Sequence, residues 1–197
     1  MERELANVCV FCASSPHVAQ PYYDAAQDLG KLLGERGHTL VYGGTNNGLM
    51  GVLARAVKAS GGRVIGVIPQ QMLGHDIDFR DADETIVTET MAERKAQMER
   101  RGDAFVALPG GFGTLEELSE VITLKQLLYV SGPIVLVNVN GYYDRFLDHL
   151  EYMYETGFAY DVYRTLYHIA ATPQEALAYI ETYKGDGDLP KKWEPPT

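Results

Sequence analysis

Short runs of apolar, largely β-branched residues alternate with segments of helical pattern along most of the chain. The clearest runs are residues 8–13 (VCVFCA), 39–42 (TLVY), 63–68 (RVIGVI), 104–108 (AFVAL) and 133–137 (PIVLV), with weaker ones at 84–87 and 167–170. The clearest runs are apolar at consecutive positions, which is typical of strands buried on both faces. This alternation predicts an α/β fold: a doubly wound, mostly parallel sheet with helices on both faces.

The helical segments and the end of the chain set the expected domain organisation. Helices are expected over residues 21–36, 48–60, 91–101, 114–130, 142–155 and 173–182. Gly37 follows the first of these, where a residue tolerant of positive φ is favoured. No linker or repeat interrupts the pattern, so residues 1–183 are predicted to form a single domain. Residues 184–197 (KGDGDLPKKWEPPT) are rich in proline, glycine and charge and are predicted to form an irregular tail.

Charge and hydropathy exclude several classes of partner. The chain has 17 Lys and Arg against 27 Asp and Glu, a net charge of −10. This balance argues against nucleic-acid binding, where basic side chains neutralise phosphates. No apolar run approaches the roughly 20 residues of a membrane-spanning helix. Because the N-terminal residues lack the pattern of a signal peptide, we expect a cytoplasmic protein without membrane contact. A small anionic ligand remains compatible with this charge.

The residue types that usually bind metals are not spaced as ligands. Cys9 and Cys12 form a C-x-x-C pair inside a predicted strand, so their side chains are expected on opposite faces, as buried thiols. The five histidines have no ligand-like spacing to one another or to a cysteine. We therefore expect neither a metal site nor a cofactor.

Three loops that follow predicted strands are built from small residues. They are residues 13–15 (ASS), 43–48 (GGTNNG) and 109–114 (PGGFGT). The glycines of the third loop permit positive φ and close backbone approach, and Thr114 is a candidate cap for the following helix. A helix N-terminus after such a loop suits a phosphate, although a tight strand-to-helix turn is the alternative. Neither a Walker A loop nor the dinucleotide fingerprint is present, which favours a mononucleotide or sugar phosphate.

Two glutamates in the next helix are distinguished by periodicity. At about 100° per residue, Glu116 falls among polar residues, whereas Glu117 falls among Val121, Leu124 and Leu128. Favourable interaction with the helix dipole would explain both residues. A carboxylate in the apolar sector, however, needs a partner. Glu117 is therefore a candidate functional residue.

The candidate partner lies on the helix over 91–101. Met91, Arg94, Lys95 and Met98 share one broad face of that helix. The cations can extend from the edge of the core to solvent, or they can bind a phosphate or base or hold Glu117. Arg94 offers a planar fork and Lys95 a point charge, so the two can hold different groups.

The motif of residues 109–117, PGGFGTLEE, resembles the P-G-G-x-G-T-x-x-E hallmark of the LOG family of cytokinin-activating phosphoribohydrolases, formerly called lysine decarboxylases. The similarity continues through VFCASS, LVYGG with GLMG, VIGVIP, ERKAQM, EELSEVIT and NVNGYYD, over roughly residues 8–160. The first two loops read CASSPH and GGTNNG, where the family commonly has CGSS and GGGxxG.

The resemblance implies a Rossmann-like fold and a homodimer with its active site near the subunit interface. It also implies hydrolysis of the N-glycosidic bond of a nucleoside 5′-monophosphate, often an N6-substituted AMP, to free base and ribose 5-phosphate. Arg94 and Glu117 would be the catalytic pair. The implied nucleotide contacts are Lys95, Gly110, Gly111, Phe112, Gly113, Thr114, Leu115, Glu116 and Thr123, with Ser14, Gly43 and Gly44 lining the same edge.

Two other functions compete with hydrolysis. A non-enzymatic nucleotide sensor or carrier, like the related molybdenum-cofactor carriers, would keep the glycine loops without needing a buried acid paired with an arginine. A pyridoxal-phosphate decarboxylase would need a Schiff-base lysine with a supporting anion site, and no lysine stands out in such a setting.

Overall fold

The computed structural model describes residues 6–74 and 78–185 and contains one seven-stranded sheet. Its strands are β1 (Asn7–Phe11), β2 (Thr39–Tyr42), β3 (Arg63–Pro69), β4 (Glu84–Thr88), β5 (Ala104–Ala107), β6 (Ile134–Val137) and β7 (His168–Ala170). They lie in the order β4-β3-β2-β1-β5-β6-β7, and every neighbouring pair is parallel. The predicted fold class is confirmed. Most of the predicted tail lies outside the described residues.

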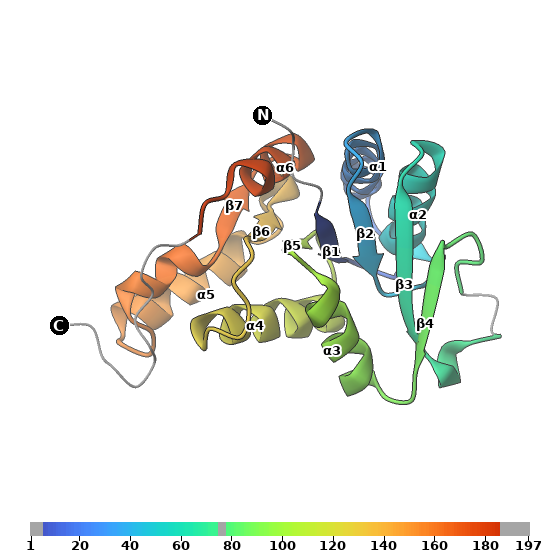
Figure 1. Cartoon of the computed structure of the whole chain (residues 1–197). Coiled ribbons are helices and arrows are strands. Elements are labelled where there is room, and N and C mark those ends of the chain that lie inside the picture. Colours follow the sequence, from blue (N-terminus) through green and yellow to red (C-terminus); the bar gives the residue numbers. More distant parts are fainter. Residues whose placement is uncertain (1–5, 75–77, 186–197) are drawn as a thin grey trace.

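Six α-helices of the described residues cover both faces of the sheet. They are α1 (Gln20–Glu35), α2 (Gly48–Ala59), α3 (Met91–Arg101), α4 (Phe112–Gln126), α5 (Asp144–Glu155) and α6 (Pro173–Thr182). Helices α1, α2 and α6 lie on one side of the sheet, and α3, α4 and α5 lie on the other (Figure 1). None of the described helices is long and apolar enough to cross a membrane.

Alternate residues of the central strands enter two separate hydrophobic layers. In β1, Val8 and Val10 pack beneath α1 and α2, whereas Cys9 and Phe11 pack beneath α3 and α4. Both faces of the strand are therefore buried, which explains the continuous apolar run in the sequence. Cys9 and Cys12 fall in different layers as free, buried thiols, as the sequence predicted.

Two glycines allow α1 and α2 to approach closely. A Cβ atom at Gly30 would lie 2.5 Å from the Leu53 carbonyl oxygen, and one at Gly34 would lie 2.6 Å from Cβ of Ser60. No side chain fits at these distances. The GKLLG segment of α1 thus determines how tightly the two helices pack, a role that the sequence patterning did not indicate.

The order of the strands creates a crevice at the carboxyl edge of the sheet. From the central β1, the chain proceeds outward through β2, β3 and β4, then returns to add β5, β6 and β7 on the other side of β1. The loops after β1 and β5 therefore lead away from each other. This topological switch point is where open α/β sheets bind their ligands.

The structure differs from the sequence expectations mainly at the ends of elements. Helix α4 begins at Phe112 rather than 114, and the chain leaves helical geometry at Leu128, where φ is 64°. Three short 3-10 helices were not predicted: η1 (Gln70–Met72), η2 (Val139–Gly141) and η3 (Asp161–Leu166). The expectation at Gly37 is confirmed, since its φ is 78°.

Candidate active site

A pocket of about 330 Å³ opens at the carboxyl edge of the sheet. Segments after β1, β2, β3 and β5 contribute to its walls, together with the N-terminal half of α3. Its lining residues are Cys12, Ala13, Ser14, Ser15, Thr45, Met50, Met72, Met91, Arg94, Gly111, Phe112, Gly113, Thr114, Glu116 and Glu117. The small-residue loops after β1 and β5 thus meet at one site, as their positions in the sequence suggested.

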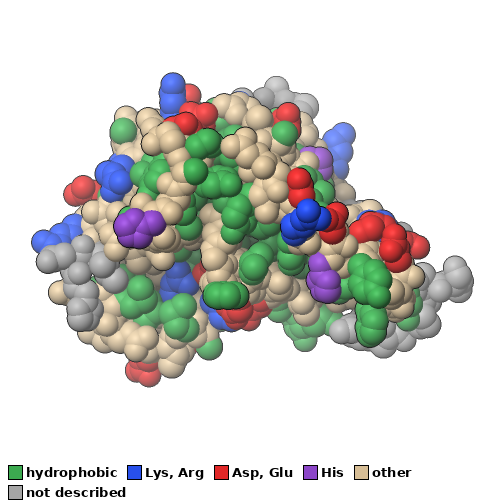
Figure 2. Space-filling view, turned by 180° about the vertical axis from the view of Figure 1, so that it is seen from behind, with side chains coloured by type: hydrophobic (Ala, Val, Ile, Leu, Met, Phe, Trp, Pro, Cys, Tyr) green, Lys and Arg blue, Asp and Glu red, His purple; other side chains and the backbone are tan. Residues whose placement is uncertain are grey.

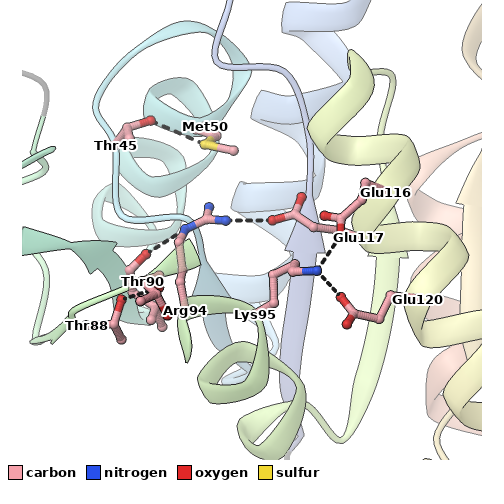
Figure 3. Close-up of polar contacts among 10 residues, drawn as sticks. Thr45, Met50, Thr88, Thr90, Arg94, Lys95, Glu116, Glu117 and Glu120 are labelled. Carbon is pink, nitrogen blue, oxygen red and sulfur yellow. Dashed lines mark hydrogen bonds and ion pairs between the residues drawn. The ribbon is translucent and has the colours of Figure 1, made fainter. Parts of the chain in front are cut away.

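Two of the lining residues, on different helices, form an ion pair. Arg94 on α3 donates from Nη1 to Oε1 of Glu117 on α4 at 2.8 Å (Figure 3). Both residues are buried, with 6% and 5% of their surfaces exposed. The periodicity argument that put Glu117 in the apolar sector of its helix is confirmed, and Arg94 is the partner that the sequence suggested.

The guanidinium of Arg94 is held on two further sides. Its Nε donates to the carbonyl oxygen of Val67 on β3 at 3.1 Å. Its Nη2 occupies the space in which Gly43 would carry a Cβ, so any side chain at position 43 would overlap it. Gly43 therefore acts by leaving room for the arginine, and it does not line the pocket.

Burial dominates the electrostatics of Glu117. Desolvation raises the pKa of its carboxyl group above the ordinary value, and the charge and hydrogen bond of Arg94 only partly offset this rise. Glu117 is therefore a stronger proton acceptor than an exposed glutamate. Burial also raises the pKa of the Cys12 thiol beside the pocket, which leaves that thiol protonated at neutral pH.

A second charged group lies beside the first, closer to solvent. Lys95 pairs with Glu116 and, at 2.7 Å, with Glu120 (Figure 3). Burial lowers the pKa of Lys95, but these two carboxylates raise it to a net value above the usual one. Burial and the neighbouring Glu120 raise the pKa of Glu99 to about 7. Lys95 is thus engaged by carboxylates and does not line the pocket.

The glycine loop presents backbone donors to the pocket. The first α4 hydrogen bond runs from the Leu115 N–H to the Gly111 carbonyl at 3.1 Å, so the preceding N–H groups have no acceptor within the helix. A Cβ at Gly111 or Gly113 would meet no atom within 4 Å. These glycines therefore leave the backbone open to a ligand, and their donors with the helix dipole suit an anion.

The expectation that Thr114 caps the helix is wrong, and the freedom of the loop glycines to adopt positive φ is not used. None of its glycines has a positive φ, because the chain enters α4 through an extended residue, Gly111. Thr114 does not cap the helix, because α4 starts two residues earlier and Gly111 occupies the N-cap position. Thr114 is instead buried in the first turn and lines the pocket.

The predicted site residues divide into two groups. The pocket brings together Arg94 and Glu117 with Ser14, Gly111, Phe112, Gly113, Thr114 and Glu116. It does not include Lys95, Gly110, Leu115, Thr123, Gly43 or Gly44. Thr123 is exposed on α4 and donates to the Ser119 carbonyl at 2.8 Å. Gly44 has a φ of 74°, so its backbone conformation accounts for the glycine.

Sequence reasoning did not assign several lining residues to the site. Thr45 follows β2 and donates to the sulfur of Met50 at 3.2 Å, while Met72 comes from η1 after β3 (Figure 3 shows the first pair). A position just past a parallel strand was the available signal for Thr45. Met72 had none, because its 3-10 helix was not predicted. The described residues contain no group of three or more His, Cys, Asp or Glu arranged to hold a metal.

Fold and site together define a Rossmann-like α/β protein with a ligand site at the switch point of its sheet. The family described as "Possible lysine decarboxylase" matches residues 50–180. The chain belongs to this family, which includes the LOG proteins that its motifs resemble.

Relatives and solved structures agree with this assignment. The chain is 42% identical over 188 residues to cytokinin riboside 5′-monophosphate phosphoribohydrolase LOG of Oryza sativa subsp. japonica, covering 95% of this chain and 78% of that one. It is 43% identical over 191 residues to LOG5 of the same description from Arabidopsis thaliana, covering 95% and 84%. A molybdenum-cofactor carrier protein from Chlamydomonas reinhardtii has a similar structure, with a TM-score of 0.68, 25% identity and 90% and 96% coverage.

Proposed function

We propose that this protein hydrolyses the N-glycosidic bond of a purine nucleoside 5′-monophosphate, either AMP or an N6-substituted AMP, to the free base and ribose 5-phosphate. The observation that carries the proposal is the buried Arg94–Glu117 pair next to the open donors of the glycine loop. Relatives at 42–43% identity that are described as phosphoribohydrolases support it.

Two kinds of lining group suggest how the nucleotide binds. The N–H groups of the first α4 turn suit the 5′-phosphate. Met50, Met72 and Met91 line the pocket from other elements and give an adaptable apolar surface suited to a base. The ribose, which joins phosphate and base, is then placed beside Glu117.

The proposed reaction uses Glu117 as an anion. Breaking the bond between C1′ and the base leaves the electron pair on the base and develops positive charge on the ribose. The ionised carboxylate stabilises that charge or accepts the proton of the attacking water, whose oxygen bonds to C1′. The departing base takes up a proton. Arg94 keeps Glu117 oriented and favours its ionised form, so it acts through the carboxylate. It also lines the pocket, where it can contact the nucleotide directly.

The carrier and decarboxylase alternatives are less well supported. A carrier on this fold has no need for a carboxylate desolvated beside an arginine. A pyridoxal-phosphate enzyme needs a lysine in its pocket. Among the described residues, no lysine lines this one, and Lys95 is engaged by two glutamates.

We also propose that the protein forms a homodimer in the cytoplasm. Tyr129, Phe158 and Tyr160 are exposed at the end of α4 and in the segment after α5, and Phe158 and Tyr160 share a hollow with Gln126 of α4. We call Phe158 and Tyr160, which share this hollow, the aromatic patch. Exposed aromatic residues of this kind are typical of protein interfaces. Buried free thiols are usual in a reducing compartment.

The decisive experiment measures base release from AMP and N6-isopentenyl-AMP by wild-type protein and by Glu117→Gln. We expect wild-type protein to release base and Glu117→Gln to lower kcat by about 10²- to 10⁴-fold, the range typical of a lost acid–base group. Nucleotide binding should be retained. Glu120→Gln, one turn further along α4 and outside the pocket, is the matched control. Binding without base release by wild-type protein would favour the carrier, and near-normal turnover by Glu117→Gln would reject the role of Glu117.

A further inference from the structure

Three successive carbonyl groups at the start of the glycine loop, those of Leu108, Pro109 and Gly110, are bound by groups from other segments of the chain. The Leu108 carbonyl accepts the Tyr143 hydroxyl at 2.7 Å, and the Pro109 carbonyl accepts the Ala13 N–H at 3.2 Å. The Gly110 carbonyl accepts the Tyr142 hydroxyl. Carbonyl oxygens repel a phosphate, so their direction decides whether the loop can hold one.

The bond from Tyr142 fixes the direction of one particular donor. The Gly110 carbonyl and the Gly111 N–H belong to the same peptide group, and the described chain contains no cis peptide bond. In a planar trans peptide the C=O and N–H bonds point in opposite directions. The Gly111 N–H must therefore point away from the Tyr142 hydroxyl.

Two neighbouring cavities show what lies on each side of this peptide. Tyr142 lines a separate apolar cavity of about 230 Å³ together with Val18, Tyr22 and Pro109. Gly111 belongs to the walls of both this cavity and the candidate active site. A peptide whose carbonyl is bound on the Tyr142 side turns its N–H toward the other side, where the open α4 donors lie.

The segment that carries Tyr142 is itself firmly held. Asn138 accepts the Tyr143 N–H through Oδ1 at 2.7 Å and donates through Nδ2 to Asp144 at 2.8 Å. Gly141 has a φ of 71° in the turn between them. The Tyr142 ring packs edge-on against Tyr22 and Tyr143, at centroid distances of 5.7 and 5.1 Å. The NVNGYYD segment therefore presents Tyr142 in a fixed orientation.

We propose that Tyr142 is a positioning residue for the phosphate site: its hydroxyl holds the Gly110–Gly111 peptide so that the Gly111 N–H joins the α4 donors that bind the 5′-phosphate. This inference rests on the proposed function for the identity of the anion. It assigns Tyr142 no contact with the bond that is broken. Loss of the hydroxyl should therefore weaken phosphate binding and leave the chemical step intact.

The test compares Tyr142→Phe with Tyr22→Phe in the full chain. Phenylalanine keeps the ring contacts of Tyr142 and removes only its hydroxyl. Tyr22 lines the same apolar cavity, but its hydroxyl makes none of the three loop hydrogen bonds. Calorimetry with inorganic phosphate and with ribose 5-phosphate gives the dissociation constants. Steady-state base release gives KM and kcat for AMP, and kcat/KM for adenosine.

We expect the dissociation constants and the KM for AMP to rise about three- to tenfold in Tyr142→Phe, the effect of one net hydrogen bond. The kcat for AMP and the kcat/KM for adenosine should stay within twofold of wild type. In amide NMR spectra, phosphate should shift the Gly111 resonance of wild-type protein more than that of Tyr142→Phe. Tyr22→Phe should match wild type throughout.

Three results would overturn the inference. They are an unchanged affinity for phosphate, an equal loss for AMP and adenosine, or the same phosphate shift at Gly111 in both proteins. Absence of base release from wild-type protein would instead reject the proposed hydrolysis, while the phosphate and NMR measurements would still test Tyr142.

Discussion

Adjacent glutamates on α4 show how burial alone separates two identical side chains. Glu116 pairs with Lys95 and remains largely exposed, whereas Glu117 is buried against Arg94. The sequence predicted this division because helical periodicity puts only Glu117 in the apolar sector. It did not reveal that Arg94 also needs Gly43, since the overlap depends on a contact between residues about fifty positions apart.

The raised pKa of Glu117 predicts a pH dependence of turnover. The proposed reaction needs the ionised carboxylate, so activity is lost as pH falls through the pKa of Glu117. Because burial raises this pKa, the acid limb of kcat should lie above the value for an ordinary glutamate. The measurement is kcat at saturating AMP, because kcat reports groups in the enzyme–substrate complex. The quantity kcat/KM would also include the free nucleotide, whose phosphate titrates at about pH 6.

A matched variant separates Glu117 from a neighbouring group. Besides burial, Arg94 and Lys95 from α3 and Glu116 from α4 are the charged groups that shift the pKa of Glu117. Glu99, whose pKa is raised to about 7, faces Glu120 instead. Glu99→Gln should leave the acid limb in place. A limb that moves in this variant would assign the titration to Glu99.

At the scale of elements, the sequence predicted every strand of the sheet and every α-helix among the described residues. A buried strand or helix face requires apolar residues along its whole length. These elements therefore leave a pattern over many residues that can be read from the sequence. The sequence did not predict the 3-10 helices or the start of α4, because short turns depend on local hydrogen bonds. Tyr142 illustrates the limit: NVNGYYD is recognisable as a motif in the sequence, but only the structure connects its first tyrosine to the Gly110 carbonyl.

The close packing of α1 on α2 predicts a large effect from a small substitution. Gly34→Val should lower the free energy of unfolding by about 1–3 kcal/mol, because its side chain would overlap Ser60 and the Val57 carbonyl. Urea denaturation measures the change. Lys31→Ala, on the exposed side of the same helix, should alter it by less than about 0.5 kcal/mol. Equal unfolding midpoints for Gly34→Val and wild type would show that α1 and α2 separate without cost.

At the scale of the whole molecule, charged side chains of both signs are spread over the surface, and some hydrophobic side chains are exposed between them. The face in Figure 2 carries acidic and basic side chains interspersed, with groups of hydrophobic side chains between them. With a net charge of −10, such a surface is poorly suited to nucleic acid. Phe158 is 85% exposed, and exposed aromatic residues are enriched at protein interfaces.

The aromatic patch predicts the outcome of a mass measurement. Light scattering should give twice the 21.8 kDa of one chain for wild-type protein. Phe158→Glu should shift the mass toward that of one chain, because it puts a charge into the proposed interface. Lys31→Glu, on the exposed side of α1, should remain a dimer. A wild-type protein with the mass of one chain would reject the homodimer.

The missing side chain at Gly43 has a consequence for protein engineering. Transplanting the carboxylate and its arginine into another parallel α/β protein would not be enough. The recipient would also need a residue without a side chain just after the neighbouring strand, where the guanidinium lies. A residue that contributes no atoms to the charge pair is thus part of what must be copied with it.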